Sequence, residues 1–183
     1  MGAVIKREDR TIVIDGVSKL HGISYTIMPD RNEVVTFAIA SLITEGDVVV
    51  LGAQKKHLWI FLTKLSQAGG KWEEVVGGIR FYRDELIATD VTTSHHPGFM
   101  TDWQGPWTVL MTQAKGTSVI HEAVFENRFG YVEELRKMGA HIELFNPKVD
   151  KPASFYNFNL EDDRPDYFHA VKIIGSTKLH DAV

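Results

Sequence analysis

Residues 97–129 read PGFMTDWQGPWTVLMTQAKGTSVIHEAVFENRF, and this stretch decides the fold. An apolar helix must have Pro106 in its first turn, because proline has no backbone N–H to donate further along a helix. Gly116 ends that helix, and a strand rich in β-branched residues follows. A polar turn, Glu126-Asn127-Arg128, comes next between two phenylalanines. The stretch is therefore predicted to be a helix–strand unit with a carboxylate, Asp102, at one end and a charged turn at the other.

The same unit is predicted once more, 70 residues earlier in the chain. Residues 63–70 (TKLSQAGG) resemble residues 133–140 (EELRKMGA), and residues 45–50 (EGDVVV) resemble residues 115–120 (KGTSVI). Both pairs keep the same offset without a gap, which is typical of a supersecondary unit used twice. Chance similarity among short apolar motifs is the alternative. The predicted unit is helix, glycine, strand, helix, glycine and strand, with a hairpin between the copies.

The remaining pattern predicts further strands and helices on both sides. Strands are expected at residues 11–14, 23–28, 47–51 and 168–174, helices at 34–43 and 58–68, and a hairpin at 72–82. The apolar strand at 47–51 is expected in the core, and Asp30 or Asn32 can cap the helix that follows them. Residues 146–167 are rich in Asp, Pro and Asn, so they are predicted to form a polar excursion with one or two short strands.

The composition excludes several classes of protein. Of 183 residues, 44% are hydrophobic and 24% charged, which is ordinary for a globular protein. The net charge of −4 gives no basic surface, so nucleic acid is not an expected partner. There is no cysteine, and the eight histidines show no ligand spacing, so neither a metal site nor a cofactor is expected. No secretory signal and no membrane-spanning run is present, which is compatible with the cytoplasm.

Two interpretations stand for each charged candidate. Asp102 either caps the helix, a contribution of about 1 kcal/mol, or acts as a general base that faces a cleft. Glu126 and Arg128 either pair with each other and fix the turn, or line a ligand site at the end of the strand. In a ligand site the guanidinium could bind a phosphate or carboxylate through two hydrogen bonds.

Three longer segments carry a family resemblance: PDRNEVVTFAIASLITEGDVV, HHPGFMTDWQGPWTVLMTQAKGTSVIHEAVFENRF and VEELRKMGAHIE. They resemble the C-terminal half of UDP-N-acetylglucosamine 1-carboxyvinyltransferase, an enolpyruvyl transferase, with the likeness covering residues 1–145 and 168–180. The sister enzyme, 3-phosphoshikimate 1-carboxyvinyltransferase, shares the fold but is not expected to carry F-E-N-R-F, and it is the second candidate. The resemblance implies an inside-out α/β barrel built from three similar units per domain, of which this chain holds about two.

The resemblance also implies a division of the chain. Residues 1–28 would be terminal strands of a neighbouring domain and the hinge, and residues 29–183 a partial barrel domain. Within it, repeat units are expected at about 29–85 and 86–145, the excursion at 146–167, and the start of a further unit at 168–183. The chain would then be a segment of a longer repetitive protein. Because two units leave apolar faces and strand edges without partners, the isolated chain is expected to dimerise.

The implied reaction moves an enolpyruvyl group from phosphoenolpyruvate to the 3-hydroxyl of UDP-N-acetylglucosamine, the first step of peptidoglycan synthesis. Asp102 would be the base, and Val124 would contact the sugar nucleotide through its backbone. The other implied site residues are Phe125, Glu126 and Arg128 in the cleft, with Asp30 and Arg31 shaping it near the hinge.

The family's catalytic cysteine loop, Lys-Asn pair and C-terminal arginine have no counterpart in these residues. The isolated chain is therefore expected to be inactive. A non-catalytic binding module on the same fold is the alternative from another functional class.

Overall fold

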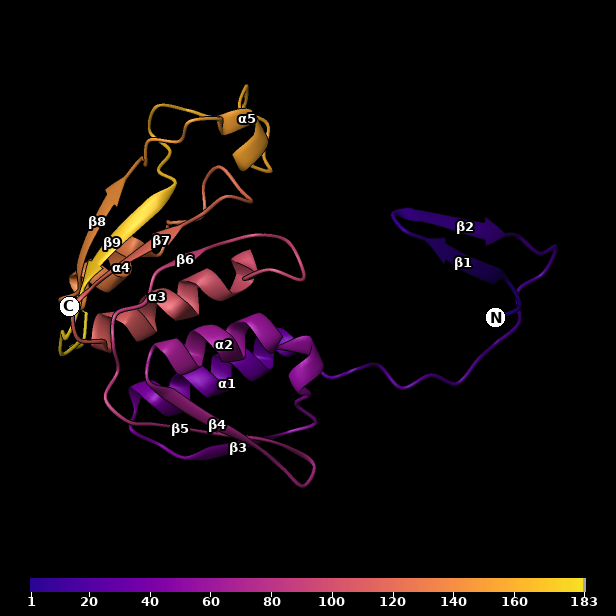
Figure 1. Ribbon diagram of the computed structural model, residues 1–183, viewed down its shortest axis with the longest axis horizontal. Helices are drawn as coiled ribbons and strands as arrows, with labels where there is room; N and C mark the ends of the chain where they lie inside the picture. Colours follow the sequence, from indigo (N-terminus) through magenta and orange to yellow (C-terminus); the bar gives the residue numbers. More distant parts are fainter. Residues whose placement is uncertain (183) are drawn as a thin grey trace.

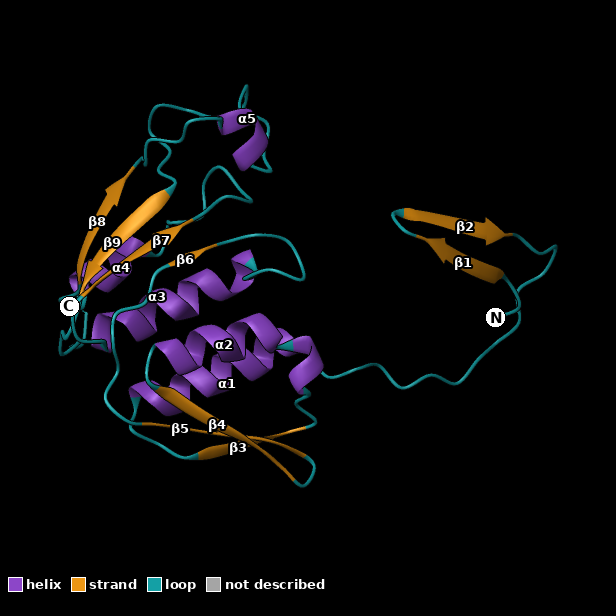
Figure 2. Ribbon diagram, viewed as in Figure 1, coloured by secondary structure: helices purple, strands orange, loops and turns teal. Residues whose placement is uncertain are grey.

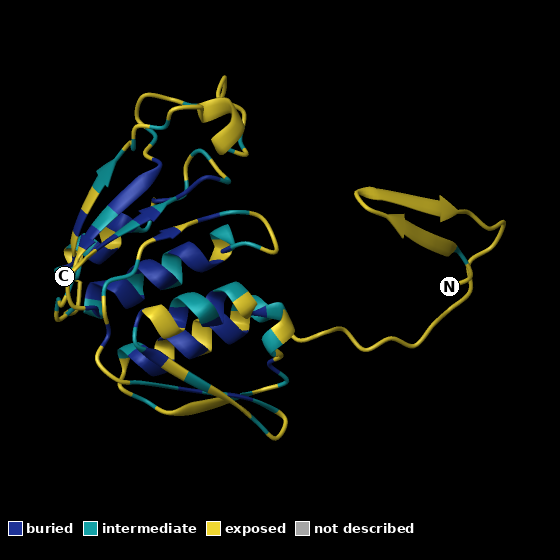
Figure 3. Ribbon diagram, viewed as in Figure 1, coloured by how far each residue is buried: buried dark blue, intermediate teal, exposed yellow. Residues whose placement is uncertain are grey.

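Three helices lie between two β-sheets in the computed structural model of the chain, which describes residues 1–182 (Figures 1 and 2). The helices are α1 (Arg31–Ile43), α2 (Trp59–Gln67) and α3 (Gln104–Gln113). Their apolar faces are buried toward one another and toward the sheets (Figure 3). Helices inside and sheets outside reverse the usual layering, in which helices cover the faces of a sheet. This arrangement agrees with the inside-out α/β fold that the resemblance implied.

The start of α1 is fixed by its own sequence. Asp30 is the N-cap, and its Oδ1 accepts a hydrogen bond from the backbone N–H of Asn32 at 2.8 Å. This confirms the predicted cap. Five apolar side chains of the helix are buried: Val34, Val35, Ala38, Ile39 and Leu42. Phe37 is 56% exposed, so α1 keeps one large apolar side chain in contact with solvent.

An aromatic cluster joins α2 to the segment that contains α3. Phe61 of α2 contacts Trp103 and Trp107 edge-on, with ring centroids 5.9 and 6.2 Å apart. Phe99 contacts the same two tryptophans at 5.6 and 5.3 Å. All four rings are almost completely buried. Because edge-to-face aromatic pairs are favourable beyond the area they bury, this cluster holds the two halves of the core together.

The two sheets share most of their strand order. The first runs β3-β5-β4 and consists of β3 (Val48–Leu51), β4 (Gly70–Val75) and β5 (Gly78–Arg83). The second runs β6-β7-β9-β8 and consists of β6 (Val91–Thr92), β7 (Thr117–His121), β8 (His141–Phe145) and β9 (Ala170–Ile174). β3 pairs with β5 and β7 pairs with β9, both antiparallel. The second sheet also has β6, which is parallel to β7.

The repeat predicted from the sequence is confirmed in the order of the elements. α1, β3, α2, β4 and β5 correspond to α3, β7, α4 (Val132–Lys137), β8 and β9. The predicted hairpin is also confirmed, since β4 and β5 pair from Gly70↔Arg83 to Val75↔Gly78. The expectation that residues 168–183 begin a further unit is wrong for β9, which pairs along its whole length with both β7 and β8. β9 completes the second sheet, because the excursion lies inside the connection from β8 to β9.

Two predicted strands differ from the structure. Residues 23–28 form no strand, and Ile23 and Ile27 are 61% and 83% exposed. Their β-branched composition favours an extended chain, but no neighbouring strand pairs with them. The strand at 47–51 exists as β3, yet it is not a core strand, since Leu51 is 75% exposed. β3 lies at the edge of its sheet and pairs only with β5, so its apolar run is half open to solvent.

The N-terminal residues form a hairpin that stands apart from the body (Figure 1). β1 (Val4–Glu8) and β2 (Thr11–Asp15) pair antiparallel, which confirms the strand predicted at 11–14. Every residue of both strands is exposed, and an extended segment joins them to α1 (Figure 3). An isolated two-stranded hairpin is marginally stable in water, so this pair is the least supported part of the fold. No helix within residues 1–182 is long and apolar enough to cross a membrane.

The excursion at 146–167 contains a short helix, α5 (Pro152–Phe155), and no strand. The prediction of one or two short strands there is wrong. Pro152 takes the first helical position, where its missing N–H costs nothing, and this favours a helical turn over a strand. Two single 3-10 turns complete the described elements, η1 (Lys55–His57) before α2 and η2 (Thr101–Trp103) before α3.

Candidate functional site

Asp102 lies in η2, immediately before α3, and does not cap the helix. The N-cap of α3 is Trp103, and no side chain caps this helix end. Asp102 Oδ1 instead accepts a hydrogen bond from Arg128 Nη2 at 3.1 Å. The interpretation of Asp102 as a helix cap is therefore wrong. Pro106 is the third residue of α3, within its first turn, as predicted.

Arg128 reaches Asp102 from the turn that follows β7. Its guanidinium also lies over the ring of Phe125, 5.1 Å from the ring centroid. The alternative in which Glu126 pairs with Arg128 is wrong, because Glu126 forms no ion pair within residues 1–182 and Arg128 pairs with Asp102. The side chains of Arg128 and Asp102 are 36% and 47% exposed. A pair so open to water adds at most about 1 kcal/mol to stability, so both groups stay available to a ligand.

Val124 and Phe125 present their backbone N–H groups inward. Both donate to the carboxylate of Glu122, at 2.8 and 3.1 Å. The Val124 carbonyl accepts no hydrogen bond from the residues that the structure describes. Among the backbone groups of Val124, the carbonyl is thus the one that is open to a ligand.

The N-terminus of α1 lies beside the Asp102 turn. Trp103 Nε1 donates to Asn32 Oδ1 at 2.9 Å, which ties η2 to the first turn of α1. Arg31 Nη1 lies 3.3 Å from His96 Nδ1 in the loop that leads to η2. Asp30 and Arg31 are therefore near the edge that carries Asp102 and Arg128, although Asp30 itself is engaged as the cap of α1.

Sequence reasoning missed Glu122, the fully buried residue that holds this edge together. Its carboxylate accepts hydrogen bonds from residues on both sides of the site, including Thr101 and Val124. The signal was present in the sequence, because an acidic residue directly follows the apolar strand TSVIH at a position expected to be buried. An acid in that position needs several hydrogen-bond donors.

The excursion packs against the same edge of the second sheet. The backbone N–H of Asn157 donates to the carbonyl of Ala123 at 2.8 Å, directly before Val124. Tyr156 OH and His121 Nε2 lie 3.0 Å apart, and the Tyr156 ring contacts His169 with centroids 5.1 Å apart. Burial, together with the nearby His169, lowers the pKa of His121. The turn after β7 is thus supported by the excursion on one side and by Glu122 on the other.

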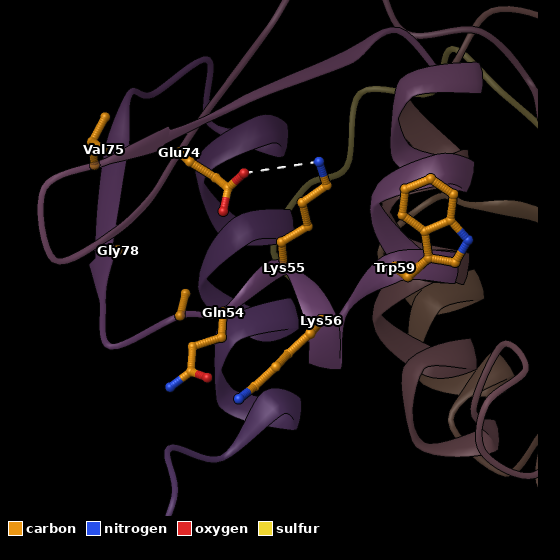
Figure 4. Close-up of a pocket in the computed structure, with 8 residues that line it drawn as sticks. Gln54, Lys55, Lys56, Trp59, Glu74, Val75 and Gly78 are labelled. Atoms are coloured by element: carbon orange, nitrogen blue, oxygen red, sulfur yellow. Dashed lines mark ion pairs between the residues drawn. The ribbon is translucent and has the colours of Figure 1, made fainter.

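A wide hollow lies elsewhere, on the first unit (Figure 4). It measures about 640 Å³ and lies between η1, the start of α2 and the β4–β5 hairpin. Lys55 and Glu74 form a long ion pair across it at 3.8 Å, and Trp59 at its rim is 63% exposed. None of the described residues that line this hollow is a buried polar side chain, so it is a weaker candidate for a ligand site than the turn that carries Asp102 and Arg128. Within residues 1–182, no group of three or more His, Asp or Glu side chains could hold a metal ion.

Residues 1–158 match the pattern of the EPSP synthase (3-phosphoshikimate 1-carboxyvinyltransferase) family. The chain belongs to this family of enolpyruvyl transferases. Two relatives within the family are UDP-N-acetylglucosamine 1-carboxyvinyltransferases. The protein from Protochlamydia amoebophila is 44% identical over 148 residues, which is 79% of this chain and 32% of the relative. The protein from Chlamydia muridarum is 38% identical over 177 residues, covering 93% of this chain and 38% of the relative.

The chain spans about a third of the length of these enolpyruvyl transferases. A solved structure, the enolpyruvyl transferase NikO from Streptomyces tendae, superposes with a TM-score of 0.73 over 98% of this chain and 39% of that chain. The sequence identity to NikO is 21%, so this likeness shows the shared enolpyruvyl transferase fold. The predicted family and the predicted fold class are both confirmed.

Proposed function

We propose that this chain is part of a UDP-N-acetylglucosamine 1-carboxyvinyltransferase and supplies one wall of its active site. The observation that carries the proposal is the Asp102–Arg128 pair, 3.1 Å apart and half open to water, beside the Val124–Phe125 turn. These residues all lie within residues 95–129, the second of the three segments that carry the family resemblance. The names of relatives at 38% and 44% identity support the same activity.

In the proposed reaction Asp102 takes the proton of the 3-hydroxyl of UDP-N-acetylglucosamine. The hydroxyl oxygen forms a bond to C2 of phosphoenolpyruvate while the C=C electron pair takes a proton at C3 from an acid outside these residues. When C3 gives up a proton again, the double bond re-forms and the bond from C2 to the phosphate oxygen breaks. Phosphate leaves with the electron pair. Arg128 Nη2 donates a hydrogen bond to the Asp102 carboxylate at 3.1 Å, and the ligand hydroxyl would take the place of the guanidinium. Any acid that completes the transfer comes from outside these residues.

The turn after β7 would bind the sugar nucleotide. We assign Val124 a contact through its carbonyl, because its N–H is already used by Glu122. Phe125 is 44% exposed, and its ring gives the ligand an apolar surface. Glu126 would line the cleft at the rim of the turn, and Asp30 with Arg31 would shape the opposite side near the hinge.

We also propose the domain division predicted above, with residues 1–28 serving a neighbouring domain and the rest forming part of one barrel domain. The exposed hairpin and the linker fit that role, since their apolar side chains lack partners. The open edge of β3 and the exposed Phe37 and Trp59 favour self-association of the isolated chain. The chain alone is expected to release no phosphate from phosphoenolpyruvate, and a cytoplasmic location stays a prediction.

Calorimetric titration of the chain with UDP-N-acetylglucosamine tests the proposal. Asp102→Asn should weaken binding roughly tenfold or more, because a hydrogen bond to a charged group is lost in the site. The matched control is Asp84→Asn, an exposed carboxylate that pairs with Lys71 on the first unit. Equal affinity of Asp102→Asn and Asp84→Asn would contradict the role of Asp102.

The second candidate is 3-phosphoshikimate 1-carboxyvinyltransferase, the enzyme that gives the matching family its name. The same titration with shikimate 3-phosphate separates the two. Preference for the smaller phosphorylated ring over UDP-N-acetylglucosamine would transfer the proposal to that enzyme. Equal binding of UDP-N-acetylglucosamine by wild type and Asp102→Asn would favour the non-catalytic module.

A further inference from the structure

Glu122 is the only acidic side chain that is completely buried within residues 1–182. It directly follows β7, and no lysine or arginine pairs with it in this part of the chain. Five hydrogen bonds reach its two oxygens. Oε1 accepts from Thr93 Oγ1 at 2.8 Å, Val124 N at 2.8 Å and Phe125 N at 3.1 Å, and Oε2 accepts from Thr101 Oγ1 at 2.7 Å and Gln104 Nε2 at 3.2 Å.

The two oxygens serve two different parts of the candidate site. Oε1 holds the backbone of Val124 and Phe125, the turn proposed to contact the sugar nucleotide. Oε2 holds Thr101, the neighbour of Asp102 in η2, and Gln104, the first residue of α3. A single rigid carboxylate therefore sets the spacing between the proposed base and the proposed ligand-binding turn.

The hydrogen-bond network continues from Gln104 to the backbone of Arg128. Gln104 Nε2 also lies 3.4 Å from the carbonyl of Arg128. Tyr131 OH donates to Gln104 Oε1, and burial raises the pKa of Tyr131, so its hydroxyl stays a neutral donor. Gln104 is consequently held in the orientation in which its amide group faces Glu122.

The first unit shows that the repeated fold does not need this carboxylate. Under the 70-residue offset, Glu122 corresponds to Gly52, which follows β3 as Glu122 follows β7. The strand and helices of the first unit form without any acid at that place. Burying a charge costs free energy unless it is hydrogen-bonded, so a unit that carries one has a further use for it.

We propose that Glu122 is a positioning residue, which fixes Asp102 relative to the backbone of Val124 and Phe125. The importance of Glu122 for the reaction rests on the proposed function. Its hydrogen bonds to the two parts of the site can be tested on this chain without a ligand. Glu122→Gln keeps the shape of the side chain and turns one acceptor oxygen into an amide donor. Oε1 and Oε2 accept from three and two donors, so at least two donors then face a group that cannot accept from them. The other donors bond to a neutral amide oxygen, which is a weaker acceptor than a carboxylate oxygen.

Amide hydrogen exchange measured by NMR is the direct test. In Glu122→Gln, the amides of Val124 and Phe125 should exchange roughly tenfold faster or more than in wild type, while the amides of α1 keep their rates. The control is Glu143→Gln, which removes an exposed carboxylate of β8 that pairs with Lys172. Unchanged exchange at Val124 and Phe125 would overturn the proposal, and so would a uniform acceleration that includes α1.

Thr101→Val tests the link between the two parts if Glu122→Gln does not fold. It removes only the hydrogen bond from η2 to Glu122. The amide resonances of Val124 and Phe125 should shift although they lie more than 20 residues away in sequence. The control is Thr36→Val, since the Thr36 hydroxyl donates only to the carbonyl of Asn32. In this control the amide resonances of Val124 and Phe125 should not shift. A change confined to the neighbours of Thr101 would overturn the proposal.

Titration with UDP-N-acetylglucosamine separates this proposal from the proposed function. If the wild-type chain does not bind the ligand but Glu122→Gln shows the local exchange effect, the proposed function fails and the positioning role stands. If wild type binds and Glu122→Gln binds equally well, the positioning role fails and the proposed function stands. With both correct, Glu122→Gln binds roughly tenfold more weakly.

Discussion

The unit from α1 to β5 and the unit from α3 to β9 share one order of elements, but their helices begin differently. In the first unit Asp30 caps α1 through its own side chain. In the second unit a 3-10 turn precedes α3, no side chain caps the helix, and Asp102 of that turn pairs with Arg128. A capping carboxylate is occupied by its own helix. An uncapped helix start leaves its carboxylate free for a partner from another element.

The two units also differ at the residue that follows their first strand. Gly52 follows β3, whereas the buried Glu122 follows β7 and organises the turn after it. The first unit connects its last two strands by a tight turn at Gly77, and the second by the long excursion that packs on Ala123. The polar side chains of the candidate site thus lie where the second unit departs from the first. The comparison indicates that the repeat supplies the scaffold and the departures supply the chemistry.

The largest effect is expected where the two units meet. Trp107→Ala removes a fully buried ring from the aromatic cluster between α2 and α3, and it should lower the free energy of unfolding by about 3–5 kcal/mol. The matched control is Trp59→Ala, since Trp59 is 63% exposed, with an expected change within about 0.5 kcal/mol. Urea unfolding of both variants is the measurement. Similar losses in the two would mean that the units are not held together through this cluster.

A smaller effect should separate the two helix starts. Asp30→Ala removes the cap of α1 and should cost about 1 kcal/mol of unfolding free energy. Asp102→Ala removes a half-exposed ion pair and no cap, so its cost should be smaller than that of Asp30→Ala and no more than about 1 kcal/mol. Urea unfolding compares the two directly. A larger loss for Asp102→Ala than for Asp30→Ala would contradict the difference between the units.

The second unit should also be the more sensitive to acid. Burial and His169 lower the pKa of His121, with Glu122 opposing, so the folded chain binds fewer protons there than the unfolded chain. Stability should therefore fall as pH drops below about 6.5, the ordinary pKa of histidine. Urea unfolding from pH 8 to pH 5 is the measurement, with His121→Asn expected to lose less stability than wild type over that range. An identical pH dependence of wild type and His121→Asn would show that His121 does not cause the loss of stability in acid.

The smallest change in stability is expected at the edge of the first sheet. Val49→Lys places a charge on β3, where Val49 is 45% exposed, so the unfolding free energy should change by no more than about 0.5 kcal/mol. The same substitution should reduce self-association, because a charged edge disfavours strand pairing between chains. Light scattering over a range of concentrations is the check. A wild-type chain that stays monomeric throughout would contradict the proposed role of this edge.

The parts of the fold that depend on local pattern were predictable. The helices, the tight hairpin and the repeat follow from the spacing of apolar residues and from the glycines at helix ends and in the turn. Residues 23–28 have the composition of a strand but form none, because a strand needs a partner and the composition of a segment does not supply one. The place of β9 in the second sheet does not follow from the repeat, because the excursion interrupts the 70-residue offset before that sheet is complete.

The candidate site was predictable only in part. Asp102 and Arg128 were identified as candidates by residue type and motif, but their distance of 3.1 Å depends on how η2 and the turn after β7 fold together. Glu122 escaped notice because its importance depends on donors from residues 93, 101 and 104, far from it in sequence. A rule that flags every acid directly after an apolar strand would have found it.

The most direct test of the comparison is an NMR titration of the chain with UDP-N-acetylglucosamine, read residue by residue. We expect amide shifts at Asp102 and at residues 122–128, while the corresponding positions of the first unit, Asn32 and residues 52–58, keep their resonances. Shifts of equal size in both units, or shifts only around Trp59 and its hollow, would contradict the claim that the second unit carries the site.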